Sequence, residues 1–181
     1  ANYTPRRKNG VIVRLPIDLV LDNQDPDFAV ERGKNEIGNR IDRAKKHLEQ
    51  SPKDLEASDI YIKQEGKYKG KIGFGDGRHR LIAAKELGAT HAMFEIEGTK
   101  EQFDALNYLL SEFGNEKGID HPELTSTYGD YKIIQTSDNS FLLNKGNDIY
   151  QVKLGKSGGI DDATATKNGK KYQLSSTEKL A

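Results

Sequence analysis

The chain of 181 residues contains no cysteine. Disulfide bonds, thiol catalysis and cysteine-ligated zinc are therefore excluded. The chain also has no excess of charge of one sign, because 28 basic residues balance 28 acidic ones, so nothing attracts it as a whole to nucleic acid or membrane. No apolar run approaches the roughly 18 residues of a spanning helix, and we expect no membrane partner. No secretory signal pattern is visible, so the expected site of action is the cytoplasm.

The most informative segment covers residues 73–81 and reads Gly-Phe-Gly-Asp-Gly-Arg-His-Arg-Leu. A short alternating strand with Ile72 and Phe74 on one face leads into a glycine-rich corner. The corner opens directly into an apolar helix, which Gly88 can terminate. This order predicts a sharp turn from strand to helix over residues 75–80.

Three basic side chains, Arg78, His79 and Arg80, stand at the start of this helix. Helix N-termini normally favour acids, because the macrodipole is positive there. The placement is explained if an anion binds the free N–H groups and the guanidinium groups. The alternative is a solvated basic turn. We favour a phosphate site, in which His79 and Arg80 are the leading ligands. The predicted phosphate-binding residues are Gly75, Gly77, Arg78, His79 and Arg80.

Asp76 lies between the two glycines of the corner. One interpretation is turn chemistry, since aspartate tolerates left-handed backbone geometry and can cap a helix. The other is catalysis, in which Asp76 holds a metal ion or activates water beside the phosphates. In that case Arg80 would act as the second catalytic group by neutralising charge on the phosphate.

The lysines Lys67, Lys69 and Lys71 alternate along the segment that enters the corner, and Tyr68 lies between the first two. Such a basic ribbon with an interleaved aromatic residue can follow a nucleic-acid backbone. The other interpretation is the wet face of an edge strand, where lysines discourage edge pairing. Both interpretations stay open, and the three lysines are the nucleic-acid candidates.

Apolar periodicity predicts the remaining elements and a division of the chain. Strands are expected at 11–21, with a bend at Pro16, and at 59–64, 71–74 and 92–97. Helices are expected at 35–50, 80–87 and 99–113. After Gly114 the sequence becomes polar, and short strands are expected at 131–134, 140–143, 149–154 and 171–174. This change predicts a small β-rich appendage. The expected divisions are a flexible arm at 1–10, a domain at 11–114 and the appendage at 125–181.

The block from Phe74 to Gly88 reads FGDGRHRLIAAKELG and resembles the glycine corner and following helix of the ParB/sulfiredoxin superfamily. The order of predicted elements over residues 11–98 is similar to that superfamily's. The resemblance implies an α+β fold with a ParB/sulfiredoxin-like mixed sheet and helices, followed here by the β-rich appendage. It also implies that the corner binds nucleotide phosphates, with His79-Arg80 in the place of a phosphate-contacting pair.

The chain differs from the superfamily's name-giving members at two points, and each difference counts against one of their functions. Arg78 stands where sulfiredoxin has its catalytic cysteine, so that reductase chemistry is excluded. No helix-turn-helix DNA reader follows the corner, which favours a phage, plasmid or toxin-effector branch over a partition protein. The kinase branch has a catalytic glutamate near the acidic loop of residues 22–31, and Glu31 is the matching candidate here. The alternative for that loop is a solvated acidic surface.

Three functions remain open from the sequence. The leading one is a nucleotide-binding domain that hydrolyses or transfers a phosphate, using a nucleoside triphosphate with Mg²⁺. The second is a non-catalytic nucleotide- or DNA-binding module. The third is a ParB-like nuclease, which needs the lysine ribbon and a carboxylate pair near the corner. The β-rich appendage is expected to bind a protein partner in each case.

Overall fold

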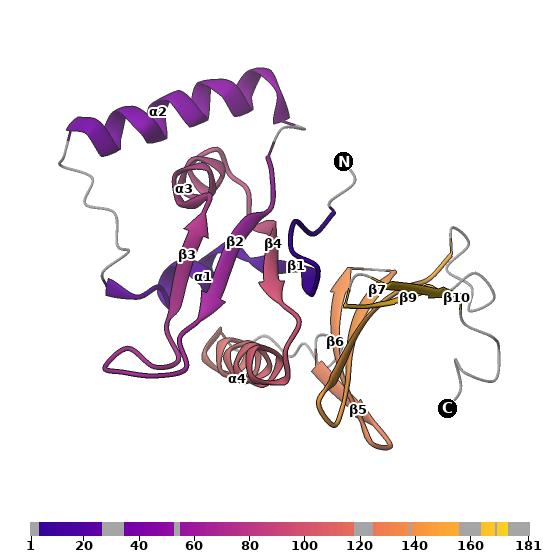
Figure 1. The fold of residues 1–181 in the computed structure, drawn as a ribbon. Helices are drawn as coiled ribbons and strands as arrows, with labels where there is room; N and C mark the ends of the chain where they lie inside the picture. The colour runs from indigo at the N-terminus through magenta and orange to yellow at the C-terminus, as the bar shows by residue number, and fades with distance from the viewer. Residues whose placement is uncertain are drawn as a thin grey trace. The chain divides into compact units, whose positions relative to one another are not determined.

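The structure is a computed structural model that describes residues 4–26, 35–52, 55–117, 125–137, 139–155, 164–168 and 170–173. The chain forms two compact units (Figure 1). The first contains residues 1–4 and 12–96, and the second contains residues 5–11 and 97–181. Helices and two separate sheets are present, which confirms the α+β class. No helix among the described residues is long and apolar enough to span a membrane.

The sheet of the first unit has four strands, which are β1 (Gly10–Pro16), β2 (Ser58–Ile62), β3 (Ile72–Asp76) and β4 (His91–Glu97). Their order across the sheet is β1-β4-β2-β3, so β3 lies at an edge. β2 pairs parallel to β4 and antiparallel to β3. One face of β2 and β3 carries Ile60, Ile62, Ile72 and Phe74, all buried. The alternation of apolar residues with other residues in the sequence indicates this buried face.

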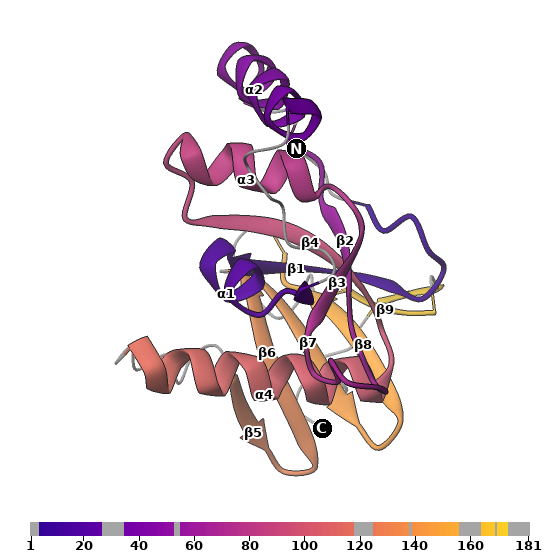
Figure 2. The ribbon, with the colours of Figure 1, turned by 90° about the vertical axis from the view of Figure 1, so that its left-hand side faces the viewer.

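Three helices complete the first unit, α1 (Ile17–Asp22), α2 (Asn35–Gln50) and α3 (Arg78–Glu86). Figures 1 and 2 show α2 lying against α3. The bounds of α2 match the predicted helix 35–50. The predicted strand 11–21 is wrong in its second half, because the strand ends at Pro16 and a helix follows. That helix buries Leu19 and Val20 together, which a strand with alternating faces would not do.

The end of α3 confirms the predicted terminator. Gly88 takes a left-handed backbone with φ of 100°. Its N–H bonds to the carbonyl of Lys85 at 2.9 Å, and the Ala89 N–H bonds to that of Ala84 at 3.0 Å. This pair of bonds is a Schellman motif, which satisfies the last carbonyls of the helix.

The acidic loop after α1 is anchored to β3. Asp25 is fully buried, and its carboxylate forms an ion pair with Lys63. The loop backbone forms two hydrogen bonds with Ile72, both at 2.8 Å. The Asp25 N–H donates to the Ile72 carbonyl, and the Ile72 N–H donates to the Asn23 carbonyl. A solvated surface is therefore wrong for Asp25. The loop meets the beginning of β3, whereas the glycine corner follows its end. Glu31 lies outside the described residues.

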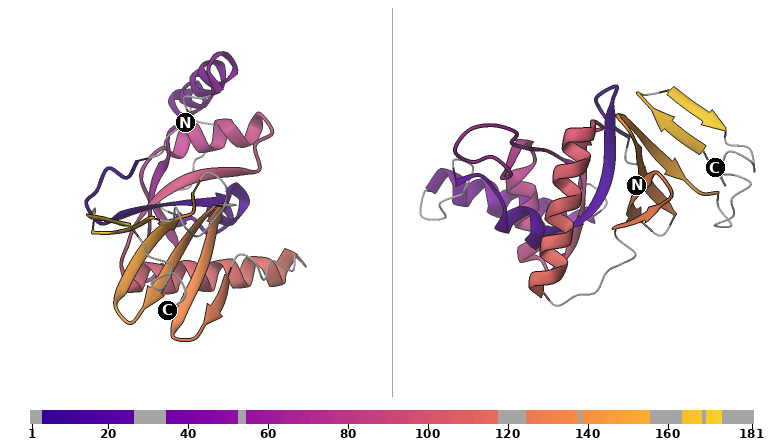
Figure 3. Two further views of the ribbon diagram at one scale, coloured as in Figure 1. Left: turned by 90° about the vertical axis from the view of Figure 1, so that its right-hand side faces the viewer. Right: turned by 90° about the horizontal axis from the view of Figure 1, so that it is seen from below.

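The second unit contains α4 (Lys100–Lys117) and a six-stranded antiparallel sheet in chain order (Figure 3). The strands are β5 (Thr125–Tyr128), β6 (Tyr131–Ser137), β7 (Ser140–Lys145), β8 (Asp148–Lys153), β9 (Thr164–Lys167) and β10 (Lys170–Gln173). β5 and β9 are not predicted from the sequence, because both are rich in threonine and have few apolar residues. From the sequence α4 is assigned to residues 11–114, but its contacts group it with this sheet.

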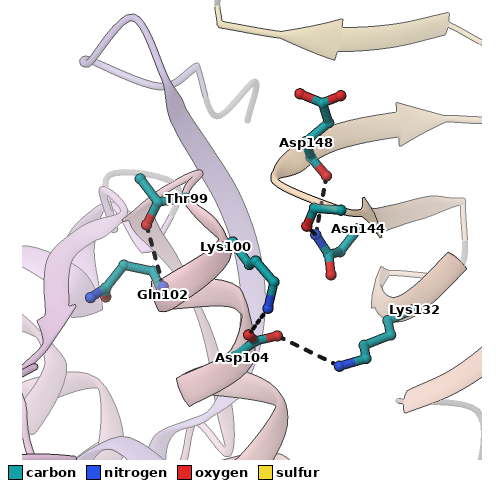
Figure 4. A network of polar contacts seen from close by, with 8 residues as sticks. Thr99, Lys100, Gln102, Asp104, Lys132, Asn144 and Asp148 are labelled. Atoms are coloured by element: carbon teal, nitrogen blue, oxygen red, sulfur yellow. Dashed lines mark hydrogen bonds and ion pairs between the residues drawn. The ribbon is translucent and has the colours of Figure 1, made fainter.

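Polar contacts fix the start of α4 and hold it to the sheet (Figure 4). The Gln102 N–H donates to Thr99 Oγ1 at 3.3 Å, so Thr99 caps the helix. Asp104 pairs with Lys100 at 2.5 Å within the helix and with Lys132 of β6 at 3.9 Å. At the β7–β8 turn, the Asn144 amide donates to the Asp148 carbonyl at 3.2 Å.

Lys63→Met is expected to lower the free energy of unfolding by about 3 kcal/mol, because it removes the cation that faces a buried carboxylate. The matched control is Lys67→Met. The Nζ atoms of both lysines lie over the Tyr68 ring, 5.4 Å from its centroid for Lys67 and 5.7 Å for Lys63. Lys67, however, is exposed. Urea unfolding compares the two variants. Equal losses would show that the Asp25 carboxylate does not depend on Lys63.

Candidate functional site

At the glycine corner, one residue with a left-handed backbone conformation connects β3 to α3. β3 ends at Asp76, and Gly77 is the N-cap of α3 with φ of 93°. The first intrahelical bond runs from the Leu81 N–H to the Gly77 carbonyl at 3.0 Å. The three preceding N–H groups, at residues 78–80, have no acceptor within the helix. No side chain caps this end, and its first turn contains no acid. Asp76 is therefore not the cap, because Gly77 takes that position.

Each glycine of this segment lies against a side chain of β2. A Cβ on Gly73 would collide with the Tyr61 ring. A Cβ on Gly75 would lie 2.7 Å from Asp59 Oδ2, and one on Gly77 would lie 2.5 Å from Ser58 Oγ. The Ser58 hydroxyl also donates to the Gly77 carbonyl at 3.2 Å. Close packing on β2 thus requires glycine at Gly77, where a Cβ would also meet Ser58 Cβ and Cα, and favours it at Gly73 against the Tyr61 ring, independently of any ligand. At Gly75 the flexible Asp59 carboxylate could move aside.

Asp59 is a second carboxylate at the corner that the sequence did not single out. It lies opposite Asp76 in the register of β2 and β3, at an irregularity that leaves Gly75 as an extra residue of β3 between Phe74 and Asp76. The position of Asp59 opposite Asp76 depends on this irregularity, and no local residue pattern in the sequence indicates it. The described residues include no group of three side chains suited to hold a metal ion. The metal-binding role of Asp76 stays a prediction.

Arg80 makes only weak contacts with acids in the protein. Its Nη2 is 3.5 Å from Asp76 Oδ2 and 3.9 Å from Glu56 Oε2, and both carboxylates are largely exposed. Exposed pairs of this kind contribute about 0–1 kcal/mol. Its Nε is buried and finds no hydrogen-bond partner within the part of the chain that the structure describes. The guanidinium is thus held near the corner and keeps donors for another acceptor.

His79 is a neutral imidazole at pH 7. Burial lowers its pKa below the ordinary value of 6.5, and the nearby charges of Arg78 and Arg40 lower it further. Its Nε2 is buried and has no hydrogen-bond partner among the residues described. Arg40 belongs to α2, so the structure adds to Arg78 and Arg80 a third arginine that the sequence did not place near the corner. The packing of α2 on α3 brings it there.

The nucleic-acid candidates lie away from the corner. Lys67 and Lys69 belong to the turn between β2 and β3, and Lys71 immediately precedes β3. The turn is closed by bonds such as Gly70 N–H to the Lys63 carbonyl at 2.8 Å. The corner begins at the other end of β3, roughly 17 Å away along the strand. The structure therefore brings residues 75–80 together and leaves the lysines at a separate place.

Comparisons of the chain with protein-family models, with curated proteins and with solved structures found no match.

Gly77→Ala is expected to destabilise the protein by about 3 kcal/mol, because it combines a left-handed alanine with a collision at Ser58. Gly66→Ala is the matched control. Gly66 has a similar φ of 84°, but a Cβ there meets nothing within 4 Å, so only about 1 kcal/mol is expected. Urea unfolding measures both losses. Equal losses would contradict close packing of Gly77 on Ser58.

The His79 side chain is expected to titrate below 6.5 in an NMR pH titration of the imidazole carbons. Arg40→Gln should raise that midpoint, whereas Lys85→Gln, at the other end of α3, should not. Because the unfolded chain binds this proton more readily, His79 lowers the protein's stability as pH falls through and below 6.5. A midpoint at or above 6.5, or one unmoved by Arg40→Gln, would contradict the described surroundings of His79.

Proposed function

We propose that the corner of residues 75–80 binds the phosphate groups of a nucleotide. One observation carries the proposal. The first turn of α3 is uncapped, and two of its residues, His79 and Arg80, each have a buried side-chain nitrogen (Nε2 and Nε) without a partner among the described residues. An uncapped helix start without acids attracts an anion. Arg80 Nε is a donor, and His79 Nε2 is one when the ring carries its hydrogen there. Buried donors left without acceptors are costly, and a phosphate oxygen would satisfy them.

The neighbouring face of β2 and β3 supports a nucleotide over a simple anion. Tyr61 and Asp59 lie two residues apart on β2, so both side chains are on the same face of the strand. They pack over Gly73 and Gly75 and fill the space that side chains would take there. The Tyr61 ring is 37% exposed and offers a surface for a base. The Asp59 carboxylate lies between Tyr61 and the corner, where it can accept hydrogen bonds from ribose hydroxyls.

Phosphate hydrolysis or transfer at this corner is the catalytic form of the proposal. Arg80 and the first-turn N–H groups would stabilise charge on the transferring phosphoryl group. Asp76 lies within 3.5 Å of Arg80 and is largely exposed, so a water molecule can reach it. Mg²⁺ is usually held by one or two carboxylates together with the phosphates, and Asp76 is the residue that would hold it here.

A non-catalytic nucleotide-binding module is the second candidate. The exposure of Asp76 favours it, because a 3.5 Å contact with Arg80 at the surface does little to orient the carboxylate toward a phosphate. The nuclease interpretation has less support, since its lysines lie at the opposite end of β3 from the carboxylates of Asp59 and Asp76.

Isothermal titration calorimetry with ATP, ADP, AMP and pyrophosphate tests the proposal. Wild-type affinity should rise with the number of phosphates, and Arg80→Gln should weaken ATP binding by about tenfold or more. Lys85→Gln removes one positive charge from the same helix at its far end and should leave the affinity nearly unchanged. Equal losses in both variants, or no binding by the wild type, would contradict a phosphate site at the corner.

Turnover separates the two candidates. If the corner is catalytic, wild-type protein with Mg²⁺ should release phosphate from a nucleoside triphosphate. Asp76→Asn should then abolish release while keeping ATP affinity within a few-fold. Binding without any release in the wild type would assign the corner to a non-catalytic module.

A further inference from the structure

The β5–β10 sheet gathers tyrosines on one face. Side chains alternate between the two faces along each strand, and the register fixes which residues share a face. One face carries Ile134, Leu142 and Ile149, all buried. It also carries Lys132, which reaches Asp104 of α4 (Figure 4). The opposite face carries the tyrosines Tyr128, Tyr131, Tyr150 and Tyr172. We call it the tyrosine face.

A lysine lies over the ring of three of these tyrosines. Lys145 Nζ is 5.2 Å from the ring centroid of Tyr131. The corresponding distances are 5.4 Å from Lys167 to Tyr150 and 5.6 Å from Lys170 to Tyr172. Each pair combines a flat aromatic surface with a positive charge at the ring.

The three pairs form a regular diagonal across the sheet. Tyr131, Tyr150 and Tyr172 lie on β6, β8 and β10, which are alternate strands running in the same direction. The register places Tyr150 two residues beyond the row of Tyr131, and Tyr172 two residues beyond the row of Tyr150. Two strand spacings and two residues of rise give roughly 12 Å between successive tyrosines. The aromatic surfaces therefore repeat at an even interval.

The tyrosine face is exposed at its two ends and carries more positive than negative charge, while Val152 and Ala165 on the same face are buried. Tyr128 is 64% exposed and Tyr172 is 43% exposed. Phe141 and Leu143 lie between them on the same face and are half-buried. The acid on this face is Asp148, which pairs with Lys167 at 2.7 Å. Lys145 and Lys170 remain as positive charges beside aromatic rings.

We propose that the tyrosine face binds single-stranded nucleic acid. A partner that matches it needs flat aromatic groups at regular intervals and a negative charge near each of them. Bases stack on aromatic rings without regard to sequence, and lysines follow the phosphates. A duplex keeps its bases stacked on one another and could contact only the lysines. The proposal does not depend on the nucleotide site, because it rests on a different unit of the chain.

Fluorescence anisotropy with a labelled 12-nucleotide DNA strand, the same RNA strand and the matching DNA duplex tests this proposal. Wild-type protein should bind both single strands more tightly than the duplex. Affinity should fall as salt rises from 50 to 200 mM. Tyr128→Ala and Tyr172→Ala should each weaken single-strand binding at least fivefold. Lys145→Gln should weaken it less and should lower its salt dependence.

Matched controls keep the result specific. Tyr108→Ala removes a tyrosine that is 65% exposed, on α4 of the same unit, and should have no effect. Lys153→Gln removes an exposed lysine from the opposite face of β8 and should have little effect. Arg80→Gln should leave strand binding unchanged, which separates this proposal from the nucleotide site. Circular dichroism melting confirms that each variant stays folded.

Several outcomes would overturn the proposal. The first is absence of single-strand binding by the folded wild type at 50 mM salt. The second is equal binding of inorganic polyphosphate, which would show attraction by charge without stacking. The third is an equal loss in Tyr108→Ala. Tyrosine-dependent self-association or capture of a protein, without strand binding, would assign the face to a protein partner.

Discussion

The corner between β3 and α3 depends on the close packing of Gly77 against Ser58. With φ of 93°, Gly77 turns the chain from an edge strand into a helix within one residue. Because Ser58 occupies the space of a side chain and bonds to the Gly77 carbonyl, β2 fixes the direction in which the helix begins. The first-turn N–H groups, Arg80 and His79 are therefore held by the sheet. A site built this way is organised before a ligand arrives, which reduces the entropy lost on binding.

The two proposed sites differ in how they attract phosphate. The corner concentrates cationic residues from α2 and α3 around uncapped N–H groups, and its burial keeps His79 neutral at pH 7. An anion placed there would favour protonation of the imidazole, so binding and proton uptake are linked. The tyrosine face instead distributes single lysines beside aromatic rings over several strands. The first arrangement suits one compact group of charges, and the second suits an extended chain of them.

The sequence was most reliable where one local cause decides the structure. The Gly88 terminator follows from local chemistry and helix 35–50 from helical periodicity, and both were predicted. The glycines of the corner were identified, but their packing cause was not, because it depends on the β2 register. Asp59 and Arg40 were missed for the same reason, since strand pairing and helix packing bring them to the corner. The burial of Asp25 was not predicted, because its partner Lys63 is distant in sequence.

The most direct measurement of the central claim is an NMR titration of ¹⁵N-labelled protein with ATP and with pyrophosphate. The account predicts that the amide signals of Arg78, His79 and Arg80 shift most with both ligands, since these N–H groups face the phosphates. Signals of Asp59 and Tyr61 should shift further with ATP only. Shifts confined to other residues, or none at saturating ligand, would contradict phosphate binding at this corner.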